Sequence, residues 1–182
     1  MNTGVISARY AKALLCYAKE SGAEESVYYN MRQLIHALNS VRELRAALRN
    51  PRLSLDERVG LLCAAVEPSV VFRDFAALVL GHGREDMLLF IAHAYIAQYR
   101  KDKGIYAAKF VTASPVSESF RQQVLEIIEE RLHADVELEC ATDASLVGGF
   151  VIEANCVRLD SSVKGKLAGI RKSLVKQNRK LV

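Results

Sequence analysis

The chain has 182 residues, of which 51% are hydrophobic and 25% are charged, and this balance excludes a disordered or fibrous protein. Its formal net charge of +4 is too small to require nucleic acid or an acidic lipid as a partner. Proline and glycine favour turns and loops, and the chain has only three prolines and ten glycines. We therefore expect few long loops and a mostly helical protein.

The start of the chain lacks the apolar core that a signal peptide needs. The densest apolar runs, residues 75–80 and 87–92, are six residues each, whereas a membrane span needs about 20. We therefore expect a soluble protein without direct membrane insertion, which could still dock onto a membrane complex. The absence of a transit peptide favours a bacterial protein.

Apolar residues repeat at helical spacing up to residue 103, which predicts six short helices. The first helix has one stripe with bulky side chains (Ile6, Tyr10, Ala13 and Tyr17) and an opposite stripe of mostly small ones (Ala8, Ala11, Leu15 and Ala18). The small stripe either receives a partner helix or packs inside the bundle, and the sequence leaves both alternatives open.

Two serine–glutamate spacings predict capping boxes, in which side chains satisfy the first-turn amides of a helix. They are Ser40 with Glu43 and Ser54 with Glu57, and they would open the third and fourth helices. Asn50-Pro51 separates these helices, because proline forces the preceding residue out of the helical region.

The fifth helix runs from about Ser69 to Leu80, and from Val70 onward it is apolar except for Arg73 and Asp74. A helix that is apolar on nearly all sides must be buried on nearly all sides. A bundle of about 100 residues hardly provides that much cover. We therefore expect part of this helix, beside Phe72 and Phe75, to receive an amphipathic partner helix. The sixth helix follows from Arg84 to about Lys103, with Leu88, Ile91, Tyr95 and Tyr99 inward.

The pattern changes after Lys103-Gly104. We expect a strand over 105–113, a helix over 117–132, a strand over 136–140, a hairpin of 148–154 and 157–159 turning at Asn155, and a last helix from Ser161 or Ser162. The predicted fold class is α+β and mostly helical. It comprises an N-terminal six-helix bundle (1–103) followed by a small β-α-β-β-β-α domain (104–182).

Residues with catalytic or ligating potential do not form a recognisable motif. The four cysteines (Cys16, Cys63, Cys140 and Cys156) are widely spaced, and we interpret them as reduced, buried thiols. The four histidines form no metal-ligand pair, and neither Gly81-His82-Gly83 nor Gly165-Lys166 completes a phosphate-binding loop. We expect no cofactor, no metal site and no catalytic residue. A small thiol or histidine enzyme is the weakest alternative.

Eight basic residues against one acid, Asp160, lie between residues 158 and 182, and this excess suggests an acidic partner. A nucleic-acid-binding module that uses the basic C-terminal helix is therefore the main alternative. It is weakened because the chain lacks a G-x-x-G loop of the KH type and a basic-aromatic RNP strand.

Five segments of the chain resemble, in order and spacing, the delta subunit family of F-type ATP synthases, whose mitochondrial member is the oligomycin sensitivity conferring protein. The segments are Ala8-Arg9-Tyr10-Ala11-Lys12-Ala13-Leu14, Asn50-Pro51, Arg84, the run 143–150 (DASLVGGF) and the run 159–164 (LDSSVK). Ser161 and Val147 are mild departures from the family's glycine and isoleucine, and the glycine-rich turn before Arg84 is unusual.

The resemblance implies a non-catalytic stator subunit of the proton-translocating enzyme, present in one copy per complex, with no cofactor and no nucleic-acid partner. In this family the bundle receives the N-terminal helix of an alpha subunit in a groove between the first and fifth helices. The corresponding residues here are Arg9, Tyr10, Ala13, Leu14, Phe72, Phe75 and Val79.

The family's C-terminal region contacts the b-type subunit of the peripheral stalk. The resemblance assigns that contact here to basic residues of the last helix: Lys164, Lys166, Arg171 and Lys172. The expected location is the cytoplasmic face of the bacterial inner membrane, where the subunit would be held peripherally through the complex.

Overall fold

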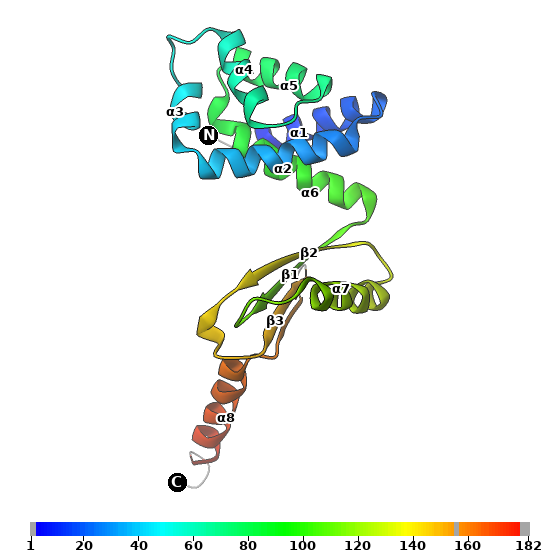
Figure 1. Cartoon of the computed structure of the whole chain (residues 1–182), viewed down its shortest axis with the longest axis vertical. Coiled ribbons are helices and arrows are strands. Elements are labelled where there is room, and N and C mark those ends of the chain that lie inside the picture. Colours follow the sequence, from blue (N-terminus) through cyan, green and yellow to red (C-terminus); the bar gives the residue numbers. More distant parts are fainter. Residues whose placement is uncertain (1–2, 155–156, 179–182) are drawn as a thin grey trace. The chain divides into compact units, whose positions relative to one another are not determined.

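The structure is a computed structural model that describes residues 3–154 and 157–178. The chain divides between Asp102 and Lys103 into two compact units, which we call the helical unit and the α+β unit (Figure 1). The fold is α+β and mostly helical, as expected. The boundary predicted from the sequence, between residues 103 and 104, is one residue further along the chain.

Six α-helices and one short 3₁₀ helix lie within residues 3–103. In chain order they are α1 (Thr3–Glu20), α2 (Glu24–Ser40), α3 (Arg42–Leu48), α4 (Leu55–Ala65), α5 (Val70–Gly81), η1 (Glu85–Met87) and α6 (Leu88–Lys103).

Large apolar side chains from all six α-helices form the core of the helical unit. Those that are almost completely buried include Met31, Leu34, Leu62, Phe72, Val79, Ile91 and Tyr95. The Tyr95 hydroxyl donates a 3.1 Å hydrogen bond to the Glu24 carbonyl, and burial raises the pKa of this tyrosine well above its usual value. The inward face predicted for the sixth helix is confirmed, because Leu88, Ile91, Tyr95 and Tyr99 are all buried.

One of the two predicted capping boxes is present. Ser54 caps α4, since its hydroxyl accepts from the Glu57 amide while the Glu57 carboxylate accepts from the Ser54 amide. The prediction for Ser40 was wrong: Ser40 ends α2, and Val41 precedes α3 without any side-chain cap. The connection between these helices is a single residue, so Ser40 is still helical and cannot adopt the extended conformation of an N-cap.

The α+β unit contains a four-stranded sheet. Its elements are β1 (Tyr106–Thr112), α7 (Glu118–Leu132), β2 (Val136–Thr142), η2 (Ala144–Leu146), β3 (Phe150–Ala154), β4 (Val157–Asp160) and α8 (Val163–Asn178). The strand order is β2-β1-β3-β4, with β1 parallel to β2 and the other neighbours antiparallel. The predicted hairpin turn at Asn155 lies outside the described residues.

Helix α7 is the crossover connection that a parallel strand pair requires, and it lies against one face of the sheet (Figure 1). Beneath it, Ala108, Phe110, Val136 and Leu138 form a small buried cluster. The last helix, α8, is different, because its side chains from Val163 to Arg171 are exposed apart from half-buried Gly165. The sheet therefore supports α8 mainly at its first turn.

Candidate partner-binding surfaces

Helices α1 and α5, which the resemblance assigns to a binding groove, are in contact and are joined by two side-chain hydrogen bonds (Figure 1). The Tyr17 hydroxyl donates to Asp74 Oδ2 at 3.0 Å. The Tyr10 hydroxyl lies 3.2 Å from His82 Nδ1. Asp74 of α5 and His82, which directly follows α5, are eight residues apart, while Tyr17 and Tyr10 are seven apart on α1. The two helices therefore run antiparallel, with these pairs about two turns apart.

Helical spacing places one residue of α1 and one residue of α5 between the Tyr17–Asp74 and Tyr10–His82 pairs. Ala13 is four residues before Tyr17, and Leu78 is four residues after Asp74. Ala13 is exposed and Leu78 is 50% exposed. A small side chain beside a half-exposed leucine gives a partner helix room to approach. We call the surface formed by Tyr10, Ala13, Tyr17, Asp74 and Leu78 the α1–α5 face.

The expectation that Phe72 and Phe75 are incompletely covered is wrong. Phe72 and Val79 are 0% exposed and Phe75 is 7% exposed. The reason is that α5 contacts α1, α2 and α4. The exposed apolar residues of α5 are instead Val70 and Leu78. Leu14 on α1 is also buried, so four of the seven predicted groove residues belong to the core.

The remaining predicted residues of α1 do reach the surface. Arg9 and Ala13 are exposed and Tyr10 is half-buried. The stripe with small side chains packs inward at Ala11, Leu15 and Ala18, which settles the alternative that the sequence left open. Only Ala8 of that stripe is exposed.

Tyr10 is held by a second contact that the sequence did not reveal. The Arg84 guanidinium donates a hydrogen bond to its hydroxyl and lies 5.1 Å from the centre of its ring. Tyr10 and Arg84 are two of the residues on which the family resemblance was based. The structure therefore brings these separate motifs together at one end of the α1–α5 face.

The electrostatics of the α1–α5 face are modest. The hydrogen bond to Asp74, and secondarily its negative charge, raise the pKa of Tyr17. Sequence reasoning missed Tyr17, Asp74, Leu78 and His82 as surface residues. The signal that could have found them is the spacing of four between Tyr17 and Ala13 and between Asp74, Leu78 and His82.

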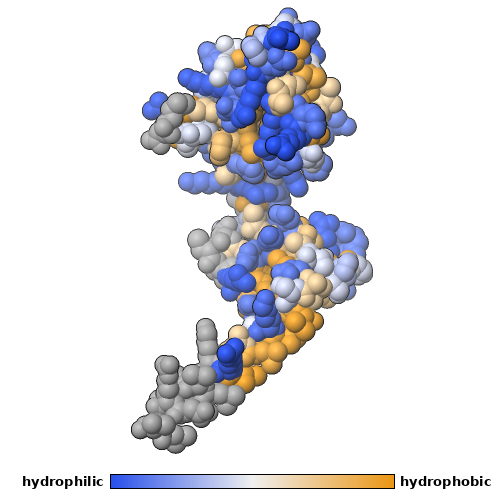
Figure 2. All heavy atoms as spheres, turned by 90° about the vertical axis from the view of Figure 1, so that its left-hand side faces the viewer, coloured by the Kyte–Doolittle hydropathy of each residue, from blue (hydrophilic) through white to orange (hydrophobic). Residues whose placement is uncertain are grey.

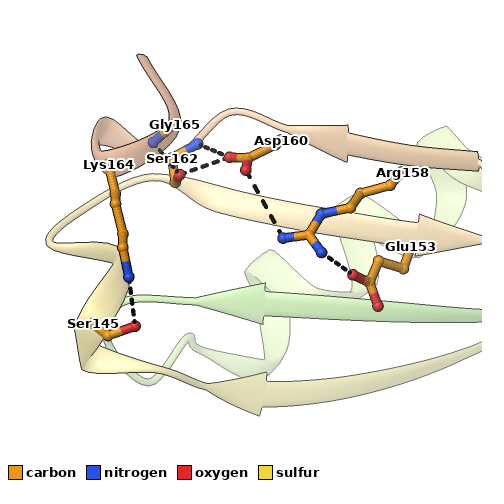
Figure 3. Close-up of polar contacts among 7 residues, drawn as sticks. All are labelled: Ser145, Glu153, Arg158, Asp160, Ser162, Lys164 and Gly165. Atoms are coloured by element: carbon orange, nitrogen blue, oxygen red, sulfur yellow. Dashed lines mark hydrogen bonds and ion pairs between the residues drawn. The ribbon is translucent and has the colours of Figure 1, made fainter. Parts of the chain in front are cut away.

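The two C-terminal motifs of the resemblance meet at the first turn of α8 (Figure 3). Asp160 Oδ1 accepts from the Ser162 amide at 2.9 Å and from its hydroxyl at 2.6 Å, while Ser162 Oγ accepts from the Gly165 amide at 2.9 Å. These hydrogen bonds, together with Arg158, lower the pKa of Asp160. Ser162 is thus the N-cap of α8, held in place by Asp160.

The run 143–150 supports this turn from the other side. The Val163 amide donates to the Gly148 carbonyl at 2.9 Å, and Lys164 Nζ reaches Ser145 Oγ at 3.5 Å. Gly149 has a φ of 77°, and a Cβ on it would lie 2.4 Å from the Ser161 carbonyl oxygen. Only glycine fits there. We call the runs 143–150 and 159–164 together the α8 joint.

From its first turn onward, α8 presents an apolar stripe with basic residues beside it (Figure 2). Val163, Leu167 and Ile170 are 40%, 59% and 56% exposed, at the spacing of one helix face. Of the predicted stalk residues, Lys164, Lys166 and Arg171 are exposed. The side chain of Lys172 lies outside the described residues.

The prediction of buried thiols is wrong for the described cysteines. Cys16 and Cys140 are exposed and Cys63 is half-buried, while Cys156 lies outside the described residues. Cys140 follows the inward alternation of Val136 and Leu138 but lies near the end of an edge strand. Within residues 3–154 and 157–178, no cluster of histidine, cysteine or acidic side chains could hold a metal ion. No helix in the same ranges has the length and apolar content needed to cross a membrane.

This fold, a helical unit followed by an α+β unit, is that of a class of ATP synthase subunits. The family described as ATP synthase delta (OSCP) subunit matches residues 6–174, and the chain belongs to it. Relatives named ATP synthase subunit delta are 39% identical in Bacteroides fragilis and 38% identical in Phocaeicola vulgatus, each covering all of both chains.

A solved structure shares the fold. A chain of the cryo-EM structure of the Toxoplasma gondii mitochondrial ATP synthase hexamer aligns with a TM-score of 0.70 at 22% identity, covering 93% of this chain and 97% of that one. The nucleic-acid alternative finds no support in these relatives.

Proposed function

We propose that this chain is a non-catalytic subunit of the peripheral stalk of an F-type ATP synthase. Family membership over residues 6–174 is the observation that carries the proposal. The subunit would attach the catalytic head to the stalk and so prevent the head from rotating with the rotor. Its location would be peripheral, on the cytoplasmic face of the bacterial inner membrane.

In this proposal the helical unit is the family's six-helix bundle and binds the N-terminal helix of an alpha subunit on its α1–α5 face. The burial of Phe72, Phe75 and Val79 means that they shape this face from beneath instead of touching the partner. Contact would fall on Ala13 and Leu78, between the Tyr17–Asp74 and Tyr10–His82 bridges. A helix on these residues would cover the apolar surface that Leu78 now exposes to water.

The α+β unit would bind the C-terminal part of a b-type stalk subunit through α8. An amphipathic helix with acidic flanks would fit its stripe of Val163, Leu167 and Ile170 beside Lys164 and Lys166. An isolated helix of 16 residues is marginally stable in water. Partner binding would therefore supply packing for the side chains of α8 that are exposed between Val163 and Arg171.

The head contact is tested by titrating a labelled peptide of the alpha-subunit N-terminus from the same organism into the full chain. We expect Leu78→Asp to weaken binding at least tenfold, because it places a charge on the apolar contact. Phe90→Asp is the matched control, since Phe90 is 55% exposed on α6 and α6 is not part of the α1–α5 face. Binding that survives Leu78→Asp but is lost in Phe90→Asp would refute the assignment.

A further inference from the structure

The turn between η2 and β3 contains a valine in a backbone conformation that valine rarely adopts. Val147 has a φ of 67° and a ψ of −34°. In the part of the chain that the structure describes, His133 is the only other residue besides glycine with a positive φ. For a β-branched residue such a conformation is an outlier that costs free energy, whereas glycine adopts it freely.

The contacts around this turn explain why the chain bends here, but they do not explain why the residue is a valine. Asp143 Oδ1 accepts a 2.8 Å hydrogen bond from the Ser145 amide, and the Val147 amide donates to the Ala144 carbonyl at 3.2 Å. Leu146 anchors the turn, because its side chain is buried. None of these contacts uses the side chain of Val147, which is 75% exposed and gains little from packing within the described residues.

Val147 lies at the first turn of α8, where the apolar stripe begins. On one side of it, Ser145 Oγ lies 3.5 Å from Lys164 Nζ (Figure 3). On the other side, the Gly148 carbonyl accepts from the Val163 amide at 2.9 Å. A Cβ on Gly148 would lie 3.2 Å from Val163 Cγ2, so the first side chain of the stripe packs against the backbone next to Val147.

The described stripe on α8 is short for a stable contact. Val163 and Ile170 are seven residues apart, which is about 10 Å along a helix. A stable interface involves about 800 Å² and 20–30 residues on each partner. A helix that covers this stripe must therefore contact further residues, and Val147 is an exposed apolar residue at the N-terminal end of α8.

We propose that Val147 belongs to the stalk-binding surface and contacts the same b-type helix that covers Val163, Leu167 and Ile170. This helix would extend past the first turn of α8 and place an apolar side chain against Val147. The inference rests on the proposed stalk attachment and adds to it a contact outside α8. The strained valine is then retained because its side chain contributes to binding, as strained residues do at other functional sites.

The test titrates a soluble fragment of the b-type subunit into the full chain. Val147→Gly removes both the side chain and the strain, so we expect about fivefold weaker binding or more, together with about threefold slower hydrogen exchange of the β3 amides. Val147→Thr keeps the branched shape but adds a hydroxyl, and should weaken binding about threefold without changing the exchange. Val70→Thr is the matched control, since Val70 is 77% exposed on α5, and it should bind normally.

A merely structural role for Val147 would not weaken binding in a variant that is more stable. Unchanged binding of Val147→Gly, or exchange that is no slower, would overturn the inference. Leu167→Asp, titrated in parallel, reports on the α8 stripe itself. Weak binding of Leu167→Asp with normal binding of both Val147 variants refutes the Val147 contact alone, whereas normal binding of all three variants contradicts the proposed stalk attachment as well.

Discussion

The Tyr17 hydroxyl donates a 3.0 Å hydrogen bond to Asp74 and thereby links two helices whose residues are 57 positions apart in the sequence. The carboxylate favours the protonated phenol and raises the pKa of Tyr17. A raised pKa in the folded state means that this stabilisation is complete below the tyrosine's ordinary pKa of about 10 and is lost as pH rises through the folded value.

We therefore expect Asp74→Asn to return the pKa of Tyr17 toward its usual value. The measurement is an alkaline titration of the Tyr17 ring by NMR. Asp56→Asn on α4 is the control and should leave the titration unchanged. A Tyr17 curve that does not move in Asp74→Asn would show that the two side chains do not interact in solution.

A second prediction concerns the buried aromatic residues of α5. Phe75→Asp should destabilise the helical unit by about 3–5 kcal/mol or more, because it removes a core ring and buries an unpaired charge. That loss is a large part of the 5–15 kcal/mol that stabilises a typical domain. Leu78→Asp, on the exposed side of the same helix, should change the free energy of unfolding by less than about 1 kcal/mol.

Urea denaturation followed by circular dichroism compares the two variants. A Phe75→Asp protein as stable as the unmodified chain would mean that this ring is accessible. In that case Phe75 itself could contact a partner helix.

The sequence predicts the elements well and their burial poorly, and α5 shows why. Helical periodicity and the serine at position 69 define where this helix begins, since the Ser69 hydroxyl accepts from the Phe72 amide. Which of its faces remains exposed depends on how many helices surround it. Contacts with α1, α2 and α4 join residues far apart in the chain, and a repeat of three to four residues carries no information about them.

The α8 joint shows the same difference between features that a local sequence pattern predicts and features that depend on contacts between distant residues. Both motifs could be recognised from the sequence, and the cap of the last helix was expected at Ser161 or Ser162. The meeting of the Gly149 backbone with Ser161 depends on the pairing of β3 with β4, which brings the two runs together. The exposure of Val163, Leu167 and Ile170 likewise depends on which elements cover α8, and a local pattern does not reveal this.

Three glycines at or near the joint give a third prediction. Gly149→Ala should destabilise the α+β unit by about 1–3 kcal/mol, because it combines a positive φ with a close approach to backbone. Gly165→Ala should weaken the cap, since its Cβ would lie 2.8 Å from Asp160 Oδ1. Gly169→Ala meets no atom within 4 Å and should stabilise the helix by about 1 kcal/mol.

Thermal melting of the three variants, followed by far-ultraviolet circular dichroism, gives the order directly. Gly169→Ala serves as the matched control, because it adds the same methyl group to the same helix as Gly165→Ala. If Gly149→Ala and Gly169→Ala melted at the same temperature, the close contact with Ser161 would not exist in solution.

The fourth prediction tests the stalk contact on α8. Leu167→Asp should reduce binding to a soluble fragment of the b-type subunit at least tenfold, because Leu167 is 59% exposed in the middle of the apolar stripe. Ile127→Asp on α7 makes an equivalent change at 58% exposure and should bind normally. Lys166→Glu should weaken binding less, and by an amount that shrinks as salt is added, since exposed charges are screened. Sedimentation or calorimetric titration with the full chain measures all three variants, and equal losses for Leu167→Asp and Ile127→Asp would remove α8 as the specific contact.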